Sequence, residues 1–333
     1  MKYGLLIYDY NYPTYNIGDY IQSLAVKQFL PEDVIYVNRE ELKDYNGDDV
    51  KIILNGWFLH NIDQWPPSAK INPLFISFHL NILAKSLLES KENINYFRKY
   101  NPIGCRDKFT QELLADAGIQ TYLSNCVTLT LGKSYKRNEG HEILFVDVFP
   151  KMYRRKVLIL ELLKQIRVGS LKNILLKFKT LIFKYKKASY RDELLKSLFD
   201  ESILKLKIEI EHDCFDENNH DRRFQKADNF LKRYSTAKVV FTSKIHCALP
   251  CLAIGTPVIF IKGQDLNNEI DECRFSEILN LLNVVSIDVD NNITCNYSSK
   301  FCKLNLTNFP LNKQINKNLV EDLISNIESF IRN

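Results

Sequence analysis

The first part of the chain alternates between two patterns of apolar and polar residues. Short runs rich in β-branched and aromatic residues predict strands, and stretches with apolar residues three and four positions apart predict helices. We predict strands at Tyr3–Tyr8, Val34–Val37, Val50–Leu54, Leu74–Phe78 and Gln120–Leu123, and helices at Asp19–Phe29 and Phe109–Ala117. Because strands and helices alternate, we expect a parallel sheet with right-handed crossovers.

The same alternation resumes after Gly132–His141, a polar and charged stretch that we predict to be a linker. The run Val127–Leu131 before this linker is predicted to be a strand. After the linker we predict strands at Ile143–Val146, Ile208–Glu211, Lys238–Phe241 and Val258–Ile261, and helices at Arg222–Tyr234, Cys247–Ile254 and about Leu319–Ile331.

These patterns predict an α/β fold with two Rossmann-like doubly wound domains that face a cleft, an arrangement similar to the GT-B fold of two-domain glycosyltransferases. A chain of 333 residues is long enough for two domains. We expect an N-terminal α/β domain over residues 1–135 and a C-terminal α/β domain over residues 136–312, with a basic helical insertion at 151–207. Residues 313–333 are expected to form a helix that packs near the domain junction.

One candidate site lies where the strand Lys238–Phe241 leads into the helix Cys247–Ile254. Ser243, Lys244 and His246 occupy this corner. The first N–H groups of a helix and the positive end of its dipole attract a phosphate or carboxylate, and Lys244 adds a positive charge beside them. Considered alone, a K-x-H tripeptide is also consistent with a solvated lysine and an ordinary histidine at a helix start.

Polar residues also stand at strand ends in the N-terminal half. Asn16, Gly18 and Asp19 open the first helix, where Asn16 or Asp19 caps the helix and Gly18 relieves backbone strain, with or without a further role in a cleft. Asn55 and His79 end two strands of the same sheet, and ligands of such sheets bind beyond the strand ends. His79 is also consistent with a hydrogen-bonded histidine of the core.

Arg106 precedes the helix Phe109–Ala117 and is a candidate anion-binding residue. A guanidinium holds a carboxylate or phosphate through two parallel hydrogen bonds. The alternative is a local salt bridge with Asp107 or Glu112, which contributes little when it is exposed.

Positive charge is concentrated in residues 151–190, which hold twelve Lys or Arg and only Glu161 as an acid, whereas the chain as a whole has a net charge of +5. Apolar residues interleave with these cations, so the segment could form amphipathic helices on an anionic membrane surface or a solvated helical face. We do not expect nucleic acid as a partner, because no recognised reader motif accompanies the charge.

The eight cysteines show no C-x-x-C spacing and are expected to be reduced and structural. The apolar run before Asp9 is too short for a signal-peptide core, and the longest uncharged run, Ile245–Ile261, carries two prolines and a glycine. We therefore expect a cytoplasmic protein, with peripheral attachment to the inner face of the cytoplasmic membrane as an open alternative.

Several motifs together resemble the polysaccharide pyruvyl transferase family. The stretch T-S-K-I-H-C-A-L-P-C-L-A-I-G-T-P at 242–257 is similar to the family's R-x-H, small-residue helix and G-x-P. Further similar motifs, in the same order as in the family, are N-I-G-D-Y-I-Q-S-L-A at 16–25, L-N-G-W-F at 54–58, F-I-S-F-H at 75–79, G-C-R-D-K-F-T at 104–110 and A-D-N-F-L-K-R-Y at 227–234.

The resemblance implies an enzyme that moves the pyruvyl unit of phosphoenolpyruvate onto two hydroxyls of a hexose as a ketal. The hexose would belong to a surface polysaccharide or its lipid-linked repeat unit. It implies His246 as general acid or base and Arg106, Lys244 and Ser243 as donor-binding residues. Lys244 departs from the family's usual Arg, and a lysine cannot reproduce the planar donor fork.

On the same resemblance, Asn16, Gly18, Asp19, Asn55 and His79 would line the acceptor side of the cleft, in the N-terminal domain, and the donor site would lie in the C-terminal domain. No metal or other cofactor is obligatory for this reaction. Phosphoenolpyruvate is a co-substrate rather than a cofactor. Two alternatives stay open: a GT-B glycosyltransferase that uses a nucleotide sugar, and a catalytically silent glycan-binding or scaffold protein.

Overall fold

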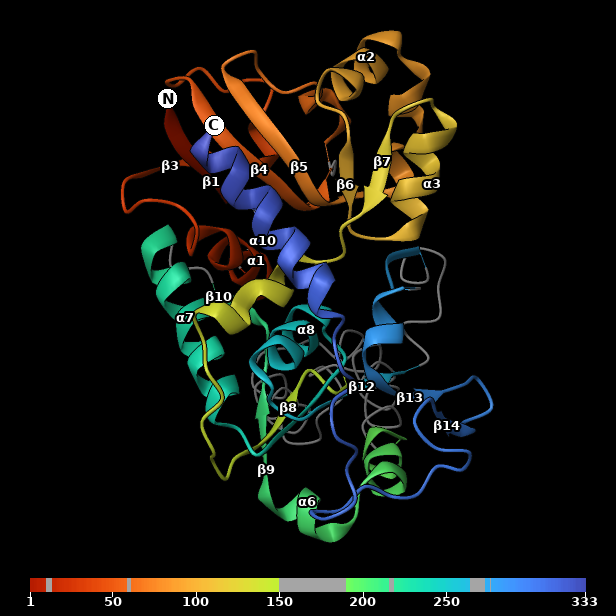
Figure 1. Ribbon diagram of the computed structural model, residues 1–333. Helices are drawn as coiled ribbons and strands as arrows, with labels where there is room; N and C mark the ends of the chain where they lie inside the picture. The colour runs from red at the N-terminus through yellow and green to blue at the C-terminus, as the bar shows by residue number, and fades with distance from the viewer. Residues whose placement is uncertain (10–13, 59–60, 150–189, 216–218, 264–272, 276) are drawn as a thin grey trace, which may run out of the picture.

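The structure is a computed structural model that describes residues 1–9, 14–58, 61–149, 190–215, 219–263, 273–275 and 277–333. Within these residues the chain forms two six-stranded sheets and a small two-stranded sheet, with helices packed around them (Figure 1). The chain is therefore a mixed α/β protein with parallel sheets, as the alternating pattern predicted.

The first sheet has the strand order β3-β1-β4-β5-β6-β7, and all its pairings are parallel. The chain moves outward from β1 to β3 and then continues on the other side of β1 with β4. Its strands are β1 (Lys2–Ile7), β3 (Val34–Asn38), β4 (Val50–Phe58), β5 (Ile71–Leu80), β6 (Ile103–Cys105) and β7 (Thr121–Leu123). The helices along this part of the chain are α1 (Ile17–Lys27), η1 (Arg39–Glu41), η2 (Ile62–Gln64), η3 (Ile82–Glu89), α2 (Lys91–Lys99) and α3 (Lys108–Asp116).

The second sheet repeats this strand order as β14-β13-β12-β11-β8-β9, with β14 antiparallel at the edge. Alternate residues of its inner strands belong to two core clusters on opposite faces, which explains their continuous apolar sequence. The strands are β8 (Ile143–Val146), β9 (Lys207–Ile210), β11 (Val239–Thr242), β12 (Val258–Lys262), β13 (Asn283–Ile287) and β14 (Ile293–Cys295). The helices are α6 (Glu201–Leu206), α7 (His220–Thr236), α8 (Ile245–Ile254) and η7 (Ile278–Leu281).

The strand prediction for Val127–Leu131 is wrong, because this segment is the first part of a 3-10 helix, η4 (Val127–Lys133). The alternation of Val, Leu and Thr imitates a strand, but Val127 to Leu131 are all buried. The Thr130 hydroxyl donates to the Val127 carbonyl at 2.8 Å and supports the helical turn. Predictions for the other strands are confirmed, with ends shifted by a few residues.

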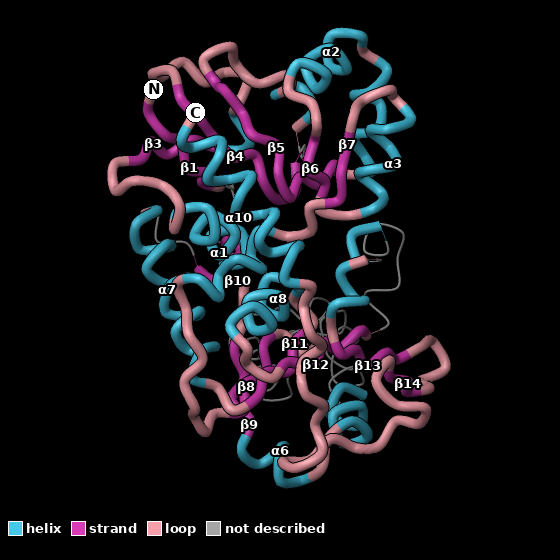
Figure 2. The backbone as a smooth tube through the Cα atoms, in the orientation of Figure 1, coloured by secondary structure: helices cyan, strands magenta, loops and turns pink. Residues whose placement is uncertain are grey.

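The predicted linker Gly132–His141 has no regular structure after Lys133 and runs beside α7 toward β8 (Figure 2). Its side chains tie it to that helix: Tyr135 donates to Asp228 at 2.7 Å and Arg137 to the Ser235 carbonyl at 3.0 Å. The domain boundaries at residues 135 and 312 stay a prediction. The basic segment proposed for membrane contact lies outside the described residues, apart from Tyr190.

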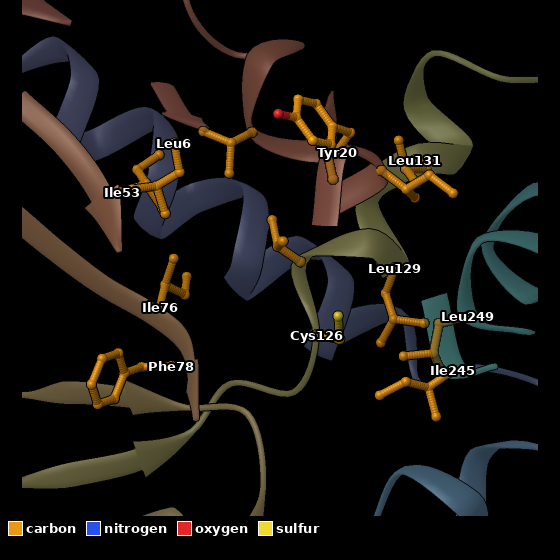
Figure 3. Close-up of a cluster of buried hydrophobic side chains, with 14 of the residues drawn as sticks. Leu6, Tyr20, Ile53, Ile76, Phe78, Cys126, Leu129, Leu131, Ile245 and Leu249 are labelled. Carbon is orange, nitrogen blue, oxygen red and sulfur yellow. The ribbon is translucent and has the colours of Figure 1, made fainter. Parts of the chain in front are cut away.

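The carboxyl ends of the two sheets approach each other through a strand pair. The strand β2 (Thr14–Asn16), which follows β1 in the chain, pairs antiparallel with β10 (Asp213–Phe215), which follows β9. The Ile17 amide also donates to the His212 carbonyl at 2.9 Å. Apolar side chains from β1, α1, β4, β5, η4 and α8 form one cluster across this junction (Figure 3).

The last helix, α10 (Lys317–Arg332), lies in front of the first sheet, and its end returns to β1 (Figure 1). Tyr3 donates its hydroxyl to the Ile331 carbonyl at 2.8 Å, and Lys133 of η4 forms an ion pair with Glu328 at 2.9 Å. Leu323 and Ile327 are its buried residues. The helix therefore joins the N-terminal sheet to η4.

The contact between η4 and α8 predicts an intolerance to larger residues at Gly132. A Cβ atom at this position would lie 2.3 Å from the Ala253 carbonyl oxygen, and a backbone atom cannot turn aside. We expect Gly132→Ala to lower the free energy of unfolding by about 1–3 kcal/mol in urea titrations. In the control Gly47→Ala, the new Cβ would meet the movable Tyr45 side chain, so a loss as large as that of Gly132→Ala would contradict this account.

Candidate functional site

Both sheets place polar residues at the point where the strand order reverses. In open α/β sheets, ligands bind outside the carboxyl ends of the strands at such a point. In the first sheet this point lies between β1 and β4, and Asn16, Gly18 and Asp19 follow β1. In the second sheet it lies between β8 and β11, followed by Asp147 and Lys244 respectively.

Arg106 is fully buried, and its side chain makes no hydrogen bond to a described residue. It directly follows β6, and its amide donates to the Phe78 carbonyl at 2.8 Å. None of the described residues accepts a hydrogen bond from its Nε, Nη1 or Nη2 atom. The nearest carboxylate oxygen, Oδ2 of Asp107, lies 3.7 Å from Nε. Such a buried charge is costly unless an anion accepts its hydrogen bonds.

The Asp107 carboxylate is already engaged by other groups. Its Oδ1 atom caps α3 by accepting from the Thr110 amide at 2.9 Å, and its Oδ2 atom lies 2.6 Å from Nδ1 of His79. Burial, and after it the Arg106 charge, lowers the pKa of His79 to about 4 despite the opposing effect of Asp107. His79 is therefore neutral at pH 7 and orients Asp107, as a hydrogen-bonded core histidine does.

His246 is the second residue of α8 and is 7% exposed. Burial, followed by the charges of Arg106 and Arg274, holds the pKa of His246 well below 6.5. Its Nε2 atom has no hydrogen-bond partner among the described residues. The imidazole is thus neutral at pH 7.

Gly18 brings the start of α1 against His246. A Cβ atom on Gly18 would lie 3.1 Å from Nδ1 of His246 and 3.0 Å from Oδ1 of Asn16. Asn16 caps α1 by accepting from the Gly18 amide at 2.9 Å. The structure therefore brings His246 against Asn16 and Gly18, from which it lies far apart in the chain.

Asp19 lies one residue further into α1 and is 7% exposed. Its Oδ1 atom is 3.6 Å from Nη1 of the buried Arg39 and accepts from Gln22 at 3.3 Å. The side chain is held in a network at the carboxyl edge of the first sheet. Its predicted role in the cleft remains a prediction.

Three buried polar groups lie on three neighbouring strands or their ends at this edge. Gly56 of β4 pairs with Phe78 of β5, and Phe78 pairs with Cys105 of β6. Asn55, Ser77 and Arg106 are each one residue from these pairs. The Asn55 amide nitrogen and the Ser77 hydroxyl are buried and, among the described residues, have no hydrogen-bond partner. Asn55, Ser77 and Arg106 therefore lie on or directly after adjacent strands, and His79 is on the same strand as Ser77.

Ser77 and Arg274 were not found from the sequence. Ser77 lies inside an apolar strand, and only its positive φ of 57° distinguishes it. The Arg274 guanidinium stacks on the Trp57 ring at 4.4 Å and, with Arg106, lowers the pKa of His246 after the effect of burial. No local motif indicates Arg274, because its contact with Trp57 and its effect on His246 arise only in the folded chain.

The corner after β11 differs in part from a simple anion site. The Ser243 hydroxyl donates to the Ile261 carbonyl at 2.7 Å, and Lys244 lies with Nζ 4.0 Å from Oδ2 of Asp147. Asp147, at φ 49°, also accepts from the His212 amide at 3.0 Å. Burial raises the pKa of Asp147 against the opposing charge of Lys244. Asp147 was not anticipated as a partner of Lys244.

Several absences hold within the described parts of the chain. No group of three or more His, Cys, Asp or Glu side chains there is placed to hold a metal ion. No helix there has the length and apolarity needed to cross a membrane. The eight cysteines, all described, are free thiols as predicted.

Ligands of open α/β sheets bind beyond the carboxyl ends of the strands, where the structure places Arg106 after β6 and His246 in the helix that follows β11. A family model for polysaccharide pyruvyl transferase matches residues 16–265, more than half of the chain. The chain belongs to the polysaccharide pyruvyl transferase family, which implies a transferase with a pyruvyl donor and a polysaccharide acceptor.

Two further comparisons add little. No curated protein matches the chain. A functionally uncharacterized protein of Klebsiella pneumoniae is similar in structure, with a TM-score of 0.43 and 12% identity over 81% of this chain and 87% of that chain. This likeness carries no inference about the site.

Arg106 is expected to destabilise the protein in the absence of ligand. A buried charge without hydrogen-bond partners carries a desolvation cost of several kcal/mol, and an apolar residue of similar length removes that cost. We therefore expect Arg106→Met to keep or raise the free energy of unfolding in urea. The matched control is Arg223→Met, which removes hydrogen bonds to the Tyr8 carbonyl at 2.9 Å and the Tyr20 hydroxyl at 2.7 Å and should destabilise the fold. A large loss for Arg106→Met would show that the residue supports the fold.

The buried His212 is expected to make the protein sensitive to acid. Burial, followed by the charge of Lys244, lowers the pKa of His212 to about 3. Below pH 6.5 this histidine is protonated in the unfolded chain and neutral in the folded chain. Its contribution to the free energy of unfolding is therefore fully present above pH 6.5 and is lost as the pH falls toward 3, by about 1.4 kcal/mol per pH unit.

His212→Gln removes this contribution. Between about pH 7.5 and 5.5, its free energy of unfolding should fall by about 1.4 kcal/mol less than that of the unmodified protein. The exposed His141→Gln is the control and should change nothing. If His212→Gln keeps the original pH dependence, His212 is not buried in its neutral form.

Proposed function

We propose that the protein transfers the pyruvyl unit of phosphoenolpyruvate onto two hydroxyls of a hexose, forming a ketal during biosynthesis of a surface polysaccharide such as a capsule. Arg106 is the main support for this proposal: it is a buried guanidinium with no hydrogen-bond acceptor among the described residues, and its charge acts on His246. A small anion with a carboxylate and a phosphate supplies the acceptors that the guanidinium lacks.

The reaction needs proton exchange and anion binding. C3 of the donor gains a proton, one hydroxyl oxygen bonds to C2, and the C2–O bond to phosphate breaks. The second hydroxyl then bonds to C2 and completes the ketal. One hydroxyl proton is thus used to form the new methyl group, and the other leaves with the phosphate. No metal is obligatory in these steps.

His246 serves as the group that exchanges protons. In its neutral state it can accept the proton of an attacking hydroxyl through Nε2. An anionic donor beside it would offset the charges of Arg106 and Arg274 that disfavour the imidazolium. Donor binding would therefore raise the pKa of His246 and let it return the proton.

The other predicted residues divide between the two substrates. Lys244, with the start of α8, would hold the phosphate, and its pairing with Asp147 keeps its charge at the strand end. The Ser243 hydroxyl is used within the fold, so Ser243 would contribute through its position at the corner. Asn16, Gly18, Asp19 and Asn55 would face the acceptor, and His79 would orient the residues beside it.

This division assigns the acceptor to the first sheet and places the donor between the two sheets, where Arg106 of the first sheet and Lys244 of the second would hold it, in a GT-B-like arrangement. The pairing of β2 with β10 and the contact of Gly18 with His246 support it. A cytoplasmic protein, peripheral to the membrane, would meet a lipid-linked repeat unit there. Residues 151–190 were proposed to provide that contact and lie almost wholly outside the described residues.

Product analysis tests the reaction. Purified protein is incubated with phosphoenolpyruvate and galactoside, glucoside and mannoside acceptors, and the products are analysed by mass spectrometry while phosphate release is followed. We expect one acceptor to gain a pyruvate ketal, and His246→Gln to lower turnover by at least about 100-fold, since general acid–base catalysis contributes about 10²–10⁴-fold.

His141→Gln is the matched histidine control and should remain fully active. If His246→Gln kept most of the turnover, His246 would be removed from the mechanism. If a nucleotide sugar bound and reacted in place of phosphoenolpyruvate, the protein would be a glycosyltransferase.

A further inference from the structure

A groove lies between the end of β7 and the first half of α10. Its volume is about 320 Å³, which is at the small end of the range for ligand pockets. The groove is lined by Tyr122, Leu123, Ser124, Asn316, Asn318, Leu319, Asp322, Leu323 and Asn326. The α10 part of the lining lies beyond residues 16–265, which match the family model.

The lining combines uncharged polar groups with aliphatic surface. Asn316, Asn318 and Asn326 carry side-chain amides. Asn316 Oδ1 accepts from the Asn318 amide at 3.1 Å and Asn326 Nδ2 donates to the Tyr122 hydroxyl at 3.5 Å, and the remaining amide groups can donate to or accept from a ligand. No described residue forms an ion pair with Asp322, so both carboxylate oxygens can accept from hydroxyls. No lysine or arginine lines the groove, which makes an anionic ligand a poor match.

The aliphatic part of the lining suits a ligand that carries apolar C–H surface as well as hydroxyls. Leu123 is 36% exposed, and Leu319 and Leu323 of α10 also line the groove. A pyranose presents hydroxyls around its edge and C–H groups on its faces. The groove therefore matches a neutral saccharide better than a phosphate or an acyl chain.

The groove begins one strand away from Arg106. The Ser124 amide donates to the Cys105 carbonyl at 2.8 Å, and the Ser124 hydroxyl accepts from the Ser77 amide at 2.9 Å. Neighbouring strands lie about 4.8 Å apart, a distance shorter than one sugar unit. A saccharide that reaches the site could therefore extend into the groove.

We propose that this groove binds a second sugar of the acceptor chain, next to the hexose that receives the pyruvate. This inference rests on the proposed function, because it assigns a subsite to the same acceptor. The groove makes the enzyme select a chain over a single sugar, and α10 supplies the selecting side chains.

Methyl NMR tests binding without the donor. The probes are hexasaccharides of glucose, galactose, mannose and N-acetylglucosamine, each added to the full chain with labelled leucine methyl groups. We expect at least one hexasaccharide to shift the signals of Leu123, Leu319 and Leu323 and to leave Leu198, in the other core cluster, unchanged. If none of the four shifts these signals, the proposal is overturned.

A matched pair of variants on α10 locates the effect. Asn326→Trp fills the groove, whereas Ser325→Trp places the same side chain at the neighbouring exposed position outside it. We expect Asn326→Trp to abolish the shifts of Leu319 and Leu323 and Ser325→Trp to retain them. Equal behaviour of the two variants would contradict a groove subsite.

Kinetics separates this inference from the proposed function. With phosphoenolpyruvate as donor, Asp322→Ala should raise KM for the hexasaccharide about tenfold, with kcat and the KM for a single hexoside unchanged, and Glu321→Ala should change neither. Methyl shifts without any ketal product would support saccharide binding in the groove and contradict the proposed function. Ketal formation without methyl shifts, or with an unchanged KM in Asp322→Ala, would contradict the proposal that the groove binds a second sugar.

Discussion

The site depends on one unfavourable feature, a guanidinium buried without hydrogen-bond acceptors in the described residues. Arg106 leaves β6 next to Asp107, yet the Asp107 carboxylate is already held by His79 and by the start of α3. Neutralising Arg106 fully within the protein would leave no binding energy for an anion. The protein instead holds the charge in place through backbone pairing on neighbouring strands, and the proposed anionic donor would supply the missing acceptors.

The same charge determines the protonation of its surroundings. After burial, Arg106 is the largest influence that lowers the pKa of both His79 and His246. Neutral His79 can donate to Asp107, and neutral His246 can accept a proton. The anion that satisfies Arg106 would also reverse its effect on His246, which couples donor binding to proton exchange.

Much of the fold was predictable because it follows local rules. The strands β1, β4, β5, β11 and β12 and the helices α1, α7 and α8 follow from periodicity, and the T-S-K-I-H motif indicated the corner at Lys244. The η4 helix was mispredicted because five residues of alternating Val, Leu and Thr resemble a strand locally. Its helical form is favoured by packing against α8, which no local pattern encodes.

The parts of the site that escaped prediction depend on distant contacts. Asp147 pairs with Lys244, Ser77 lies beside Arg106, and Arg274 stacks on Trp57, each across a large separation in sequence. Gly18 was recognised as a residue of a helix start, but its contact with His246 arises only when the two sheets meet. Residue types at strand ends therefore indicated the chemistry, and the fold supplied the pairing.

Isothermal titration calorimetry with phosphoenolpyruvate tests the role of Arg106 most directly. Titrations of the unmodified protein in buffers of different ionisation enthalpy should show binding with uptake of protons, and Arg106→Met should not bind the donor. Binding of phosphoenolpyruvate to Arg106→Met with unchanged affinity would contradict the role assigned to this buried charge.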